Sequence, residues 1–182
     1  APTPPYRQIG QTIADLIRSQ GALSVDQALT IIRQVLEALD HAHGMNLVHR
    51  DIKPENILIQ RSSGRALLVD FGIAKQIGEA AGGLTQTGFT LGTPHYMAPE
   101  QAAADPHVDH RADLYAVGAM AYEMLCGRPP FSGLSPQQVP AAHVTMPAAP
   151  LNCQHPPVPP APNPRVRGCL RRKSDARGPA AN

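Results

Sequence analysis

The sequence predicts a mainly α-helical domain of the α+β class, in which a short β-hairpin is inserted among the helices. Apolar residues recur at helical spacing over residues 12–20 and 24–43, and residues 109–126 are apolar nearly all round. Between these segments, short aliphatic runs at 57–59 and 66–69 have the length and composition of strands. The 182-residue chain is 42% hydrophobic and only 4% aromatic, which indicates one buried and mostly aliphatic core.

Two capped helices follow a proline-rich lead over residues 1–10. Thr12 and Asp15 form a capping box ahead of the first helix, and Ser24 and Gln27 repeat that pattern ahead of the second. A glycine follows each apolar stripe and predicts where each helix ends. The second helix carries a single apolar stripe, so we expect one of its faces to pack against the core.

The apolar period changes after the second helix and predicts short strands. Leu47–Val48 and residues 57–59 and 66–69 are aliphatic or β-branched runs, and Arg61–Gly64 has the composition of a hairpin turn. Residues 76–95 are rich in glycine and threonine and lack a period, which is typical of a functional loop.

The region after the apolar helix has a different composition. Pro129 and Pro130 end that helix, and Pro140 with the run PPVPPAPNP at residues 156–164 predicts that no long helix follows. Residues 165–177 carry six basic residues and one acid. We favour a solvated helix face for this segment over a phosphate- or lipid-binding patch.

Charge and cysteine content narrow the classes of partner and compartment. A net charge of +2 is too small to indicate nucleic-acid or membrane binding on its own. The three cysteines lie far apart, and such sparse cysteines fit a reducing cytoplasm better than a disulfide framework. The longest apolar run, Ala116–Cys126, is too short to span a bilayer. We therefore expect a cytoplasmic chain without a membrane segment of its own, and leave open an anchor in a longer parent protein.

One polar stretch between two apolar runs has the composition of a phosphoryl-transfer site. Residues 48–59 have the sequence VHRDIKPENILI, and a further acid, Asp70, follows the next aliphatic run. Asp51 can accept the proton of a hydroxyl nucleophile, and Lys53 can stabilise a phosphate. Asn56 and Asp70 can offer oxygen ligands to Mg²⁺.

Several short motifs, in their order and spacing, resemble those of protein kinases. They are HRDIKPEN at residues 49–56, DFG at 70–72, APE at 98–100 and DLYAVG at 113–118. Lys53 and the Gly92-Thr93 pair are similar to the serine/threonine class, and the sequence around the motifs resembles bacterial eukaryotic-like kinases. The resemblance runs from about Gly10 to Phe131 and implies a protein-kinase-like C-terminal lobe, with its hairpin at the catalytic loop.

The resemblance implies a role for each residue of the predicted site. Asp51 would be the catalytic base that orients a serine or threonine hydroxyl, and Lys53 would contact the γ-phosphate of ATP. Asn56 and Asp70 would hold Mg²⁺ or Mn²⁺, and Leu58 would lie beneath the adenine ring. The substrates would be proteins, so the chain would be an ATP-dependent phosphotransferase.

The resemblance also implies regulatory residues. Arg50 would pair with a phosphorylated Thr85 or Thr87, which another kinase chain would phosphorylate. His49 and Phe71 would pack together inside the lobe, where a half-buried histidine and phenylalanine also have an ordinary structural role.

Four further residues would have architectural roles in such a kinase. Gly72 would let the chain turn sharply after the metal-binding aspartate. Glu100 would form a buried ion pair with Arg177, because a buried acid left unpaired is costly. Asp113 would brace the catalytic loop and would not react.

The sequence departs from the kinase pattern at both ends. Residues 1–48 contain no G-x-G-x-x-G motif and no V-A-I-K-like strand, which in kinases cover and clamp the ATP phosphates. We interpret residues 1–10 as an altered hinge, residues 11–132 as the core of the C-terminal lobe, and residues 133–182 as a divergent, proline-rich and basic end.

Three functions are compatible with these observations. The first is a partial serine/threonine kinase, with this chain expected to be inactive alone. The second is a non-catalytic kinase-like lobe that acts as a protein-binding module, and the third is a nucleic-acid or membrane contact through the basic segment. The four intact site residues favour the first, because a module that only binds has no need of their combined chemistry.

Overall fold

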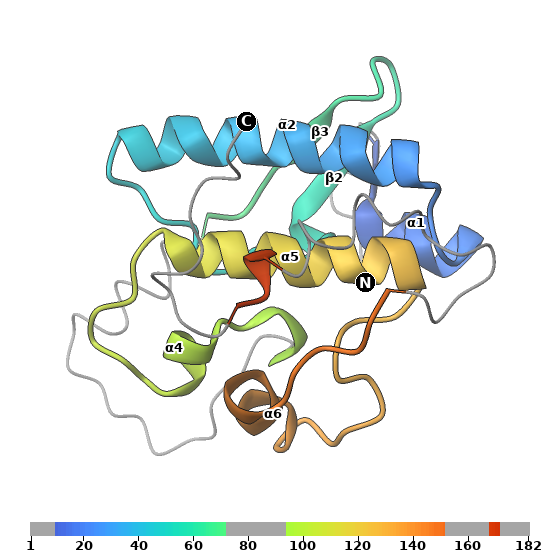
Figure 1. Cartoon of the computed structure of the whole chain (residues 1–182). Coiled ribbons are helices and arrows are strands. Elements are labelled where there is room, and N and C mark those ends of the chain that lie inside the picture. Colours follow the sequence, from blue (N-terminus) through green and yellow to red (C-terminus); the bar gives the residue numbers. More distant parts are fainter. Residues whose placement is uncertain (1–9, 72–93, 152–167, 172–182) are drawn as a thin grey trace, which may run out of the picture.

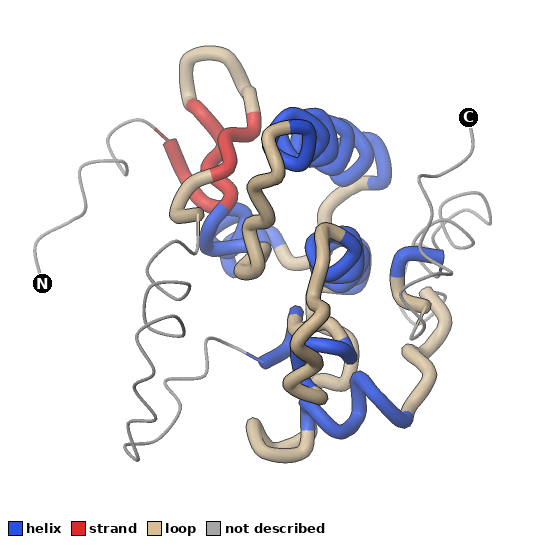
Figure 2. The backbone as a smooth tube through the Cα atoms, turned by 90° about the vertical axis from the view of Figure 1, so that its left-hand side faces the viewer, coloured by secondary structure: helices blue, strands red, loops and turns tan. Residues whose placement is uncertain are grey.

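The computed structural model describes residues 10–71, 94–151 and 168–171, and it consists of helices around a small sheet (Figure 1). Two long helices, α2 (Val25–Gly44) and α5 (Arg111–Cys126), lie side by side, as the end-on view of Figure 2 also shows. The sheet packs against α2, and short helices lie on the other side of α5. The predicted mixture of helices with a short β-hairpin is confirmed.

The two predicted N-terminal helices form with the caps that the sequence indicates. In α1 (Ile13–Gln20), the Thr12 hydroxyl accepts the Asp15 N–H at 3.1 Å, and the Asp15 carboxylate accepts the Thr12 N–H at 3.3 Å. Ser24 and Gln27 make the equivalent pair of bonds at the start of α2. The stripe of α2 that faces the core is buried and consists of Ala28, Ile31, Val35, Leu39 and Ala42.

The sheet has three antiparallel strands in the order β1-β2-β3, namely β1 (Gly10–Thr12), β2 (Ile57–Gln60) and β3 (Ala66–Leu68). The hairpin between β2 and β3 is confirmed. The prediction that residues 1–10 form only a loop is wrong at Gly10, which pairs with Gln60 at the edge of the sheet. A side chain at Gly10 would lie 2.2 Å from the Ile59 carbonyl oxygen, so glycine is required there.

The predicted strand at Leu47–Val48 is absent, because these residues follow directly on a helix end. The Leu47 N–H donates to the Ala42 carbonyl oxygen at 2.9 Å, which folds the chain back across the last turn of α2. The segment then continues as irregular backbone into residues 49–53, where the predicted site residues begin.

Helix α5 is the centre of the hydrophobic core. Every residue from Tyr115 to Cys126 except Glu123 is buried, which confirms the expectation from its nearly continuous apolar sequence. Gly127 ends the helix in the left-handed conformation, with φ of 71°, and its N–H donates to the Glu123 carbonyl. Of the helices in the described part of the chain, none combines the length and the apolar character that crossing a membrane requires.

The short helices on the far side of α5 are α4 (Pro99–Ala102), α6 (Val139–Thr145) and the 3₁₀ turn η3 (Pro94–Tyr96), whereas the 3₁₀ turn η2 (Pro54–Asn56) contacts α1 and β1. Among the described residues after Pro130, α6 is the longest helix and has only seven residues, which agrees with the prediction that no long helix follows. Pro140 lies in the first turn of α6, where its missing N–H would have had no helical partner. Helix α6 packs against α4 and η3.

Residues 168–171, drawn in red in Figure 1, dock onto α5 at Gly118. A Cβ atom built on Gly118 would lie 2.7 Å from the Cys169 Cβ and 3.4 Å from the Leu170 Cγ. Leu170 is half-buried and packs against the core. The absence of a side chain at Gly118 therefore permits this close approach.

We expect Gly118→Ala to lower the free energy of unfolding by about 1–3 kcal/mol, because the new methyl group must displace the 168–171 segment. Gly44→Ala is the matched control, since nothing lies within 4 Å of the Cβ position at Gly44. Urea denaturation followed by circular dichroism measures both variants. Equal midpoints for the two variants would contradict the close packing at Gly118.

Candidate active site

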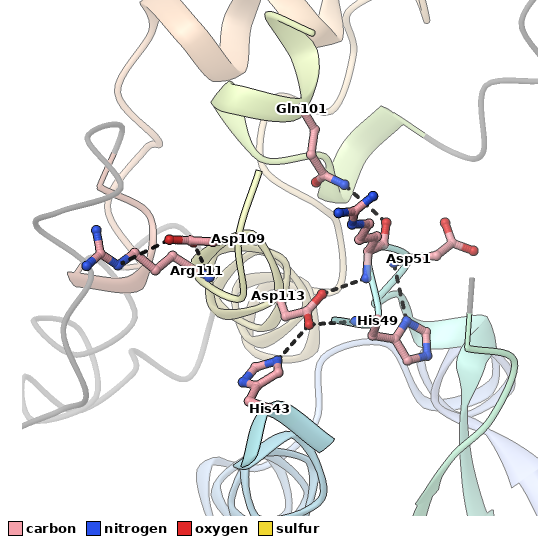
Figure 3. A network of polar contacts seen from close by, with 8 residues as sticks. His43, His49, Asp51, Gln101, Asp109, Arg111 and Asp113 are labelled. Carbon is pink, nitrogen blue, oxygen red and sulfur yellow. Dashed lines mark hydrogen bonds and ion pairs between the residues drawn. The ribbon is translucent and has the colours of Figure 1, made fainter. Parts of the chain in front are cut away.

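The predicted catalytic loop is held by one buried carboxylate, that of Asp113. Asp113 lies in the first turn of α5 and is 1% exposed. Its Oδ2 accepts the His49 backbone N–H at 2.9 Å, and its Oδ1 accepts the Arg50 backbone N–H at 2.8 Å (Figure 3). The loop is therefore fixed to α5 through its backbone, so the side chains of residues 49 and 50 are left for other contacts.

A third contact to the same carboxylate comes from His43 in the last turn of α2. The His43 Nε2 atom lies 2.8 Å from the Asp113 Oδ2, so α2, α5 and the loop meet at Asp113. Three hydrogen-bonding groups around one carboxylate compensate its burial, which would otherwise cost several kcal/mol. Sequence analysis missed His43, although a histidine four residues after Leu39 on the apolar stripe of α2 was a usable signal.

Asp51, Lys53 and Asn56 form a compact polar cluster on the loop. The Lys53 Nζ donates to the Asp51 Oδ2 at 2.8 Å, and both side chains are about one-fifth exposed, at 19% and 20%. The Asn56 Nδ2 donates to the Asp51 carbonyl at 2.8 Å and to its Oδ2 at 3.2 Å. Neither bond uses the Asn56 Oδ1 atom, so the amide is oriented with an oxygen free to serve as a ligand.

The β2–β3 ladder brings Asp70 to the same end of the sheet as Asn56. Ile57 pairs with Leu68, and one residue further the Val69 N–H donates to the Asn56 carbonyl at 2.9 Å. Asp70 is exposed and has a left-handed φ of 58°, which turns the chain at this point.

The donor set of Asn56 and Asp70 fits a hard divalent cation. One amide oxygen and one carboxylate are ligands that Mg²⁺ accepts, with further positions filled by phosphate and water. Within residues 10–71, 94–151 and 168–171, no three His, Cys, Asp or Glu side chains form a cluster suited to a metal.

His49 and Phe71 pack together behind the loop, with ring centroids 4.7 Å apart. His49 is fully buried, its Nδ1 accepts the Asp51 N–H at 3.3 Å, and its Nε2 meets the Val69 carbonyl at 3.3 Å. Burial lowers the pKa of His49, although nearby Asp113 and the Val69 carbonyl oppose the shift. A neutral ring that accepts at Nδ1 and donates at Nε2 satisfies both contacts.

Helix α4 is fastened to the loop by Gln101. The Gln101 Nε2 donates to the Arg50 carbonyl at 3.1 Å, and its Oε1 accepts the Ala98 N–H at 3.0 Å. Arg50 itself is half-buried and left-handed, with φ of 63°. Glu100, next to Gln101, is half-buried. Sequence analysis missed Gln101, because a glutamine in a short turn carries no distinctive pattern.

Tyr96 links the segment before α4 to the core helix. Its hydroxyl donates to the Glu123 carboxylate, the one side chain of the second half of α5 that is not buried. Burial and the neighbouring Glu123 carboxylate raise the pKa of Tyr96, and burial also raises the pKa of Glu123. A single acid in an apolar helix was the sequence signal for this contact.

The remaining predicted residues divide into two groups. Leu58 is 2% exposed on β2, where it pairs with Thr12 and Leu67. Gly72, Thr85, Thr87 and Arg177 lie outside the described residues, so the roles assigned to them stay predictions.

We expect Asp113→Asn to destabilise the protein by about 1–3 kcal/mol. One backbone N–H of the loop would then face the NH₂ group of the asparagine and would lose its hydrogen-bond acceptor. Asp109→Asn, at an exposed position just before α5, is the control and should change stability by less than about 0.5 kcal/mol. Urea denaturation gives the stabilities, and hydrogen exchange at His49 and Arg50 reports the loop itself. Unchanged exchange at these two amides in Asp113→Asn would contradict the anchoring role.

Stability should fall as the pH is lowered from 7.5 to 5. Burial lowers the pKa of His49, His95 and His143, the last to about 4. The unfolded chain binds protons near pH 6.5, before these folded groups do, so stability is lost below that pH and levels off below the folded pKa values. Between pH 7.5 and 5, His143 alone accounts for a loss on the order of 2 kcal/mol.

Urea midpoints at pH 7.5, 6.0 and 5.0 measure this dependence. His143→Gln should flatten it, and His107→Gln, at an exposed position, should retain it. A dependence that is equally steep in both variants would show that His143 does not contribute.

Comparisons with known proteins show the family to which the chain belongs. The model of the protein kinase domain family matches residues 6–163. A probable serine/threonine-protein kinase PknB of Bifidobacterium longum is 43% identical over 150 residues, which cover 82% of this chain and 21% of the relative. The serine/threonine-protein kinase PknB of Mycobacterium tuberculosis is 38% identical over 146 residues, covering 80% of this chain and 23% of the relative.

A probable serine/threonine-protein kinase of Corynebacterium efficiens is 42% identical over 135 residues, which cover 74% of this chain and 20% of the relative. The chain thus spans about a fifth of the length of the curated relatives it matches. The family match extends over most of the chain and includes every described residue of the predicted site. The chain belongs to the protein kinase family and is similar to its bacterial serine/threonine members.

Proposed function

We propose that this chain is the C-terminal lobe of a serine/threonine protein kinase, which transfers the γ-phosphate of ATP to serine and threonine hydroxyls of proteins. The observation that carries the proposal is the cluster of Asp51, Lys53 and Asn56, joined by hydrogen bonds of 2.8–3.2 Å on a loop fixed to Asp113. Phosphoryl transfer depends mainly on positioning and charge, and this loop supplies both.

Asp51 would accept the proton of the substrate hydroxyl and orient its oxygen. The ammonium group of Lys53 lies 2.8 Å from the Asp51 carboxylate, beside the proposed base. Its positive charge would there balance the negative charge of the phosphate. The Asn56 amide donates to the same Asp51 oxygen as Lys53, so two hydrogen bonds fix the orientation of the base. This preorganisation is the main contribution that the described residues make to catalysis.

Asn56 and Asp70 would hold Mg²⁺ or Mn²⁺ through their side-chain oxygens, and Leu58 would form the apolar floor beneath the adenine of ATP. A bound divalent ion supplies positive charge to the phosphates of ATP. The free Asn56 Oδ1 and the exposed Asp70 carboxylate support this assignment, because both are hard oxygen donors at one end of the sheet. Because the reaction consumes ATP, we propose the cytoplasm as the compartment.

Regulation would act through Arg50, which we propose pairs with a phosphate on Thr85 or Thr87 added by another kinase chain. Its left-handed backbone and the hydrogen bond from Gln101 to its carbonyl fix the position from which its side chain departs. For the architecture we propose an ion pair between Glu100 and Arg177, packing of His49 with Phe71, a turn at Gly72 and a bracing role for Asp113.

We further propose that residues 1–10 correspond to a hinge, residues 11–132 to the core of the lobe and residues 133–182 to its divergent end. Because residues 1–48 contain no glycine-rich loop or strand lysine, we expect the 182-residue chain alone to transfer little phosphate. The alternative is a binding module without catalysis, which would not depend on Asp51.

The test is transfer of labelled phosphate to a generic basic protein. The chain alone should give no more transfer than its Asp51→Asn variant. A fusion that places the N-terminal part of the kinase domain of the Bifidobacterium longum relative before this chain should transfer phosphate. Asp51→Asn should lower that rate by about 10²–10⁴-fold, since it removes a general base.

Asp105→Asn, an exposed acid beyond α4, is the control and should leave the rate of the fusion unchanged. Asp51-dependent transfer by the chain alone would overturn the expected inactivity and still support the kinase assignment. A folded fusion with no Asp51-dependent transfer would overturn the kinase assignment and favour the binding module.

A further inference from the structure

A glutamine of α2 that the proposed mechanism does not use contacts the edge of the sheet. β3 is the last strand in the order β1-β2-β3, and it lies beside α2 (Figure 1). The Gln34 Oε1 accepts the Ala66 backbone N–H at 2.7 Å. Both residues are half-buried, so this hydrogen bond is partly shielded from water. A side chain of α2 thus takes the place that a further strand would occupy.

The pairing of β2 with β3 explains why Ala66 needs a partner outside the sheet. The Arg65 carbonyl accepts the Gln60 N–H, and the Val69 N–H donates to the Asn56 carbonyl, both at 2.9 Å. Hydrogen-bonded and non-hydrogen-bonded residues alternate in an antiparallel pair, so the backbone groups of Ala66 point away from β2. The Ala66 N–H can therefore be satisfied only from the side of α2 or by water.

An open groove of about 620 Å³ lies between the second half of α2 and β3. The helix lines it with Ala38 and Met45 among others, and Leu68 and Phe71 line it from the strand side. Met45 is 60% exposed, and Leu68 and Phe71 are only half-buried, so the described side chains do not fill the space between the two walls. Loosely packed groups constrain one another weakly, so the hydrogen bond to Ala66 holds β3 where packing does not.

The strand that Gln34 holds leads directly to a proposed metal ligand. β3 has three residues, and Asp70 follows it after Val69. A displacement at the start of so short a strand reaches its end, because few hydrogen bonds hold it. Helix α2 is itself joined to the catalytic loop, because His43 contacts Asp113. Gln34 and His43 therefore tie the strand before Asp70 and the loop to one helix.

We propose that Gln34 is a positioning residue for the metal site: by holding Ala66 it fixes β3 against α2, and so places Asp70 at the end of the sheet where Asn56 lies. This inference rests on the proposed kinase function for the metal, and on the contact between α2 and β3 for its mechanism. Gln34 is not itself one of the proposed metal ligands and acts through the backbone of β3.

Three variants of the 182-residue chain separate the acceptor of Gln34 from its bulk. Gln34→Met has nearly the same length but lacks the carbonyl oxygen, whereas Gln34→Glu retains an oxygen acceptor at that position. Arg33→Met, at an exposed position of the same helix, is the matched control. Amide hydrogen exchange, measured without metal or ATP, gives the first result independently of catalysis.

We expect Gln34→Met to accelerate exchange of the Ala66 amide by about tenfold, because this N–H loses its acceptor. Exchange of the Val69 amide should accelerate by about threefold. The Val69 N–H donates to the Asn56 carbonyl, so its exchange reports the end of the strand next to Asp70.

Gln34→Glu and Arg33→Met should leave both exchange rates close to those of the wild type. Acceleration at Ala66 without any at Val69 would overturn the positioning role, because the effect would then be confined to the start of the strand. Failure of the glutamate to restore the rates, or equal acceleration of the Val35 amide inside α2, would overturn it as well.

Paramagnetic broadening by Mn²⁺ extends the test to the metal ligand. Added to the nitrogen-15-labelled chain, Mn²⁺ should broaden the Asp70 amide signal. Gln34→Met should raise the Mn²⁺ concentration for half-broadening by about threefold, which is less than the loss of a direct partner of a metal ligand causes. An equal concentration in the wild type and in Gln34→Met would overturn the role of Gln34 at the metal site.

The two experiments distinguish failure of this inference from failure of the proposed function. Absence of broadening in the wild type would overturn the metal assignment of the proposed function. The exchange rates of Ala66 and Val69 would then decide alone whether Gln34 fixes β3, because they are measured without metal.

Discussion

The buried carboxylate of Asp113 is the interaction on which the site depends. It accepts two consecutive backbone N–H groups of the loop and contacts His43 from α2, so a single side chain joins two helices and the loop between them. The two oxygens of a carboxylate have enough lone pairs to accept all three contacts, whereas an amide of the same size has only one acceptor oxygen. Because the backbone N–H groups of His49 and Arg50 are hydrogen-bonded to Asp113, the loop needs no regular secondary structure there.

This anchoring allows a backbone that would otherwise be unfavourable. Arg50 and Asp70 are both left-handed although neither is a glycine, and each such residue costs on the order of 1–3 kcal/mol. Two hydrogen bonds hold Arg50 in this conformation: its N–H donates to Asp113, and its carbonyl accepts from Gln101. Arg50 directly precedes Asp51, and Asp70 directly follows Val69, whose N–H donates to the Asn56 carbonyl, so the backbone turns next to the residues of the proposed chemistry.

The sequence predicted those elements whose signals are local. The caps of α1 and α2, the β2–β3 hairpin and the burial of α5 follow from capping pairs, turn composition and apolar period, and all of them form. The wrong predictions have two different causes. Gly10 becomes a strand only because the distant β2 lies beside it, whereas Leu47–Val48 is not a strand because it folds back locally on the last turn of α2.

The candidate site divides in the same way. Asp51, Lys53 and Asn56 lie within six residues, so their spacing alone indicated a common site. His43, Gln101 and Tyr96 support the loop and its surroundings from outside it, and their partners become evident only once the helices are packed. A polar residue on an apolar stripe, such as His43 or Glu123, is the sequence signal of such a supporting contact.

The long chain distance between the catalytic loop and its anchor also constrains how the protein folds. His49 and Asp113 are 64 residues apart, so the loop is synthesised well before the helix that fixes it. At a synthesis rate of 5–20 residues per second, α5 emerges roughly 3–13 seconds after the loop. Contacts between such distant residues form late in folding, because a long loop must close first. The shape of the proposed active site thus depends on the docking of α5 against α2, which cannot precede the synthesis of α5.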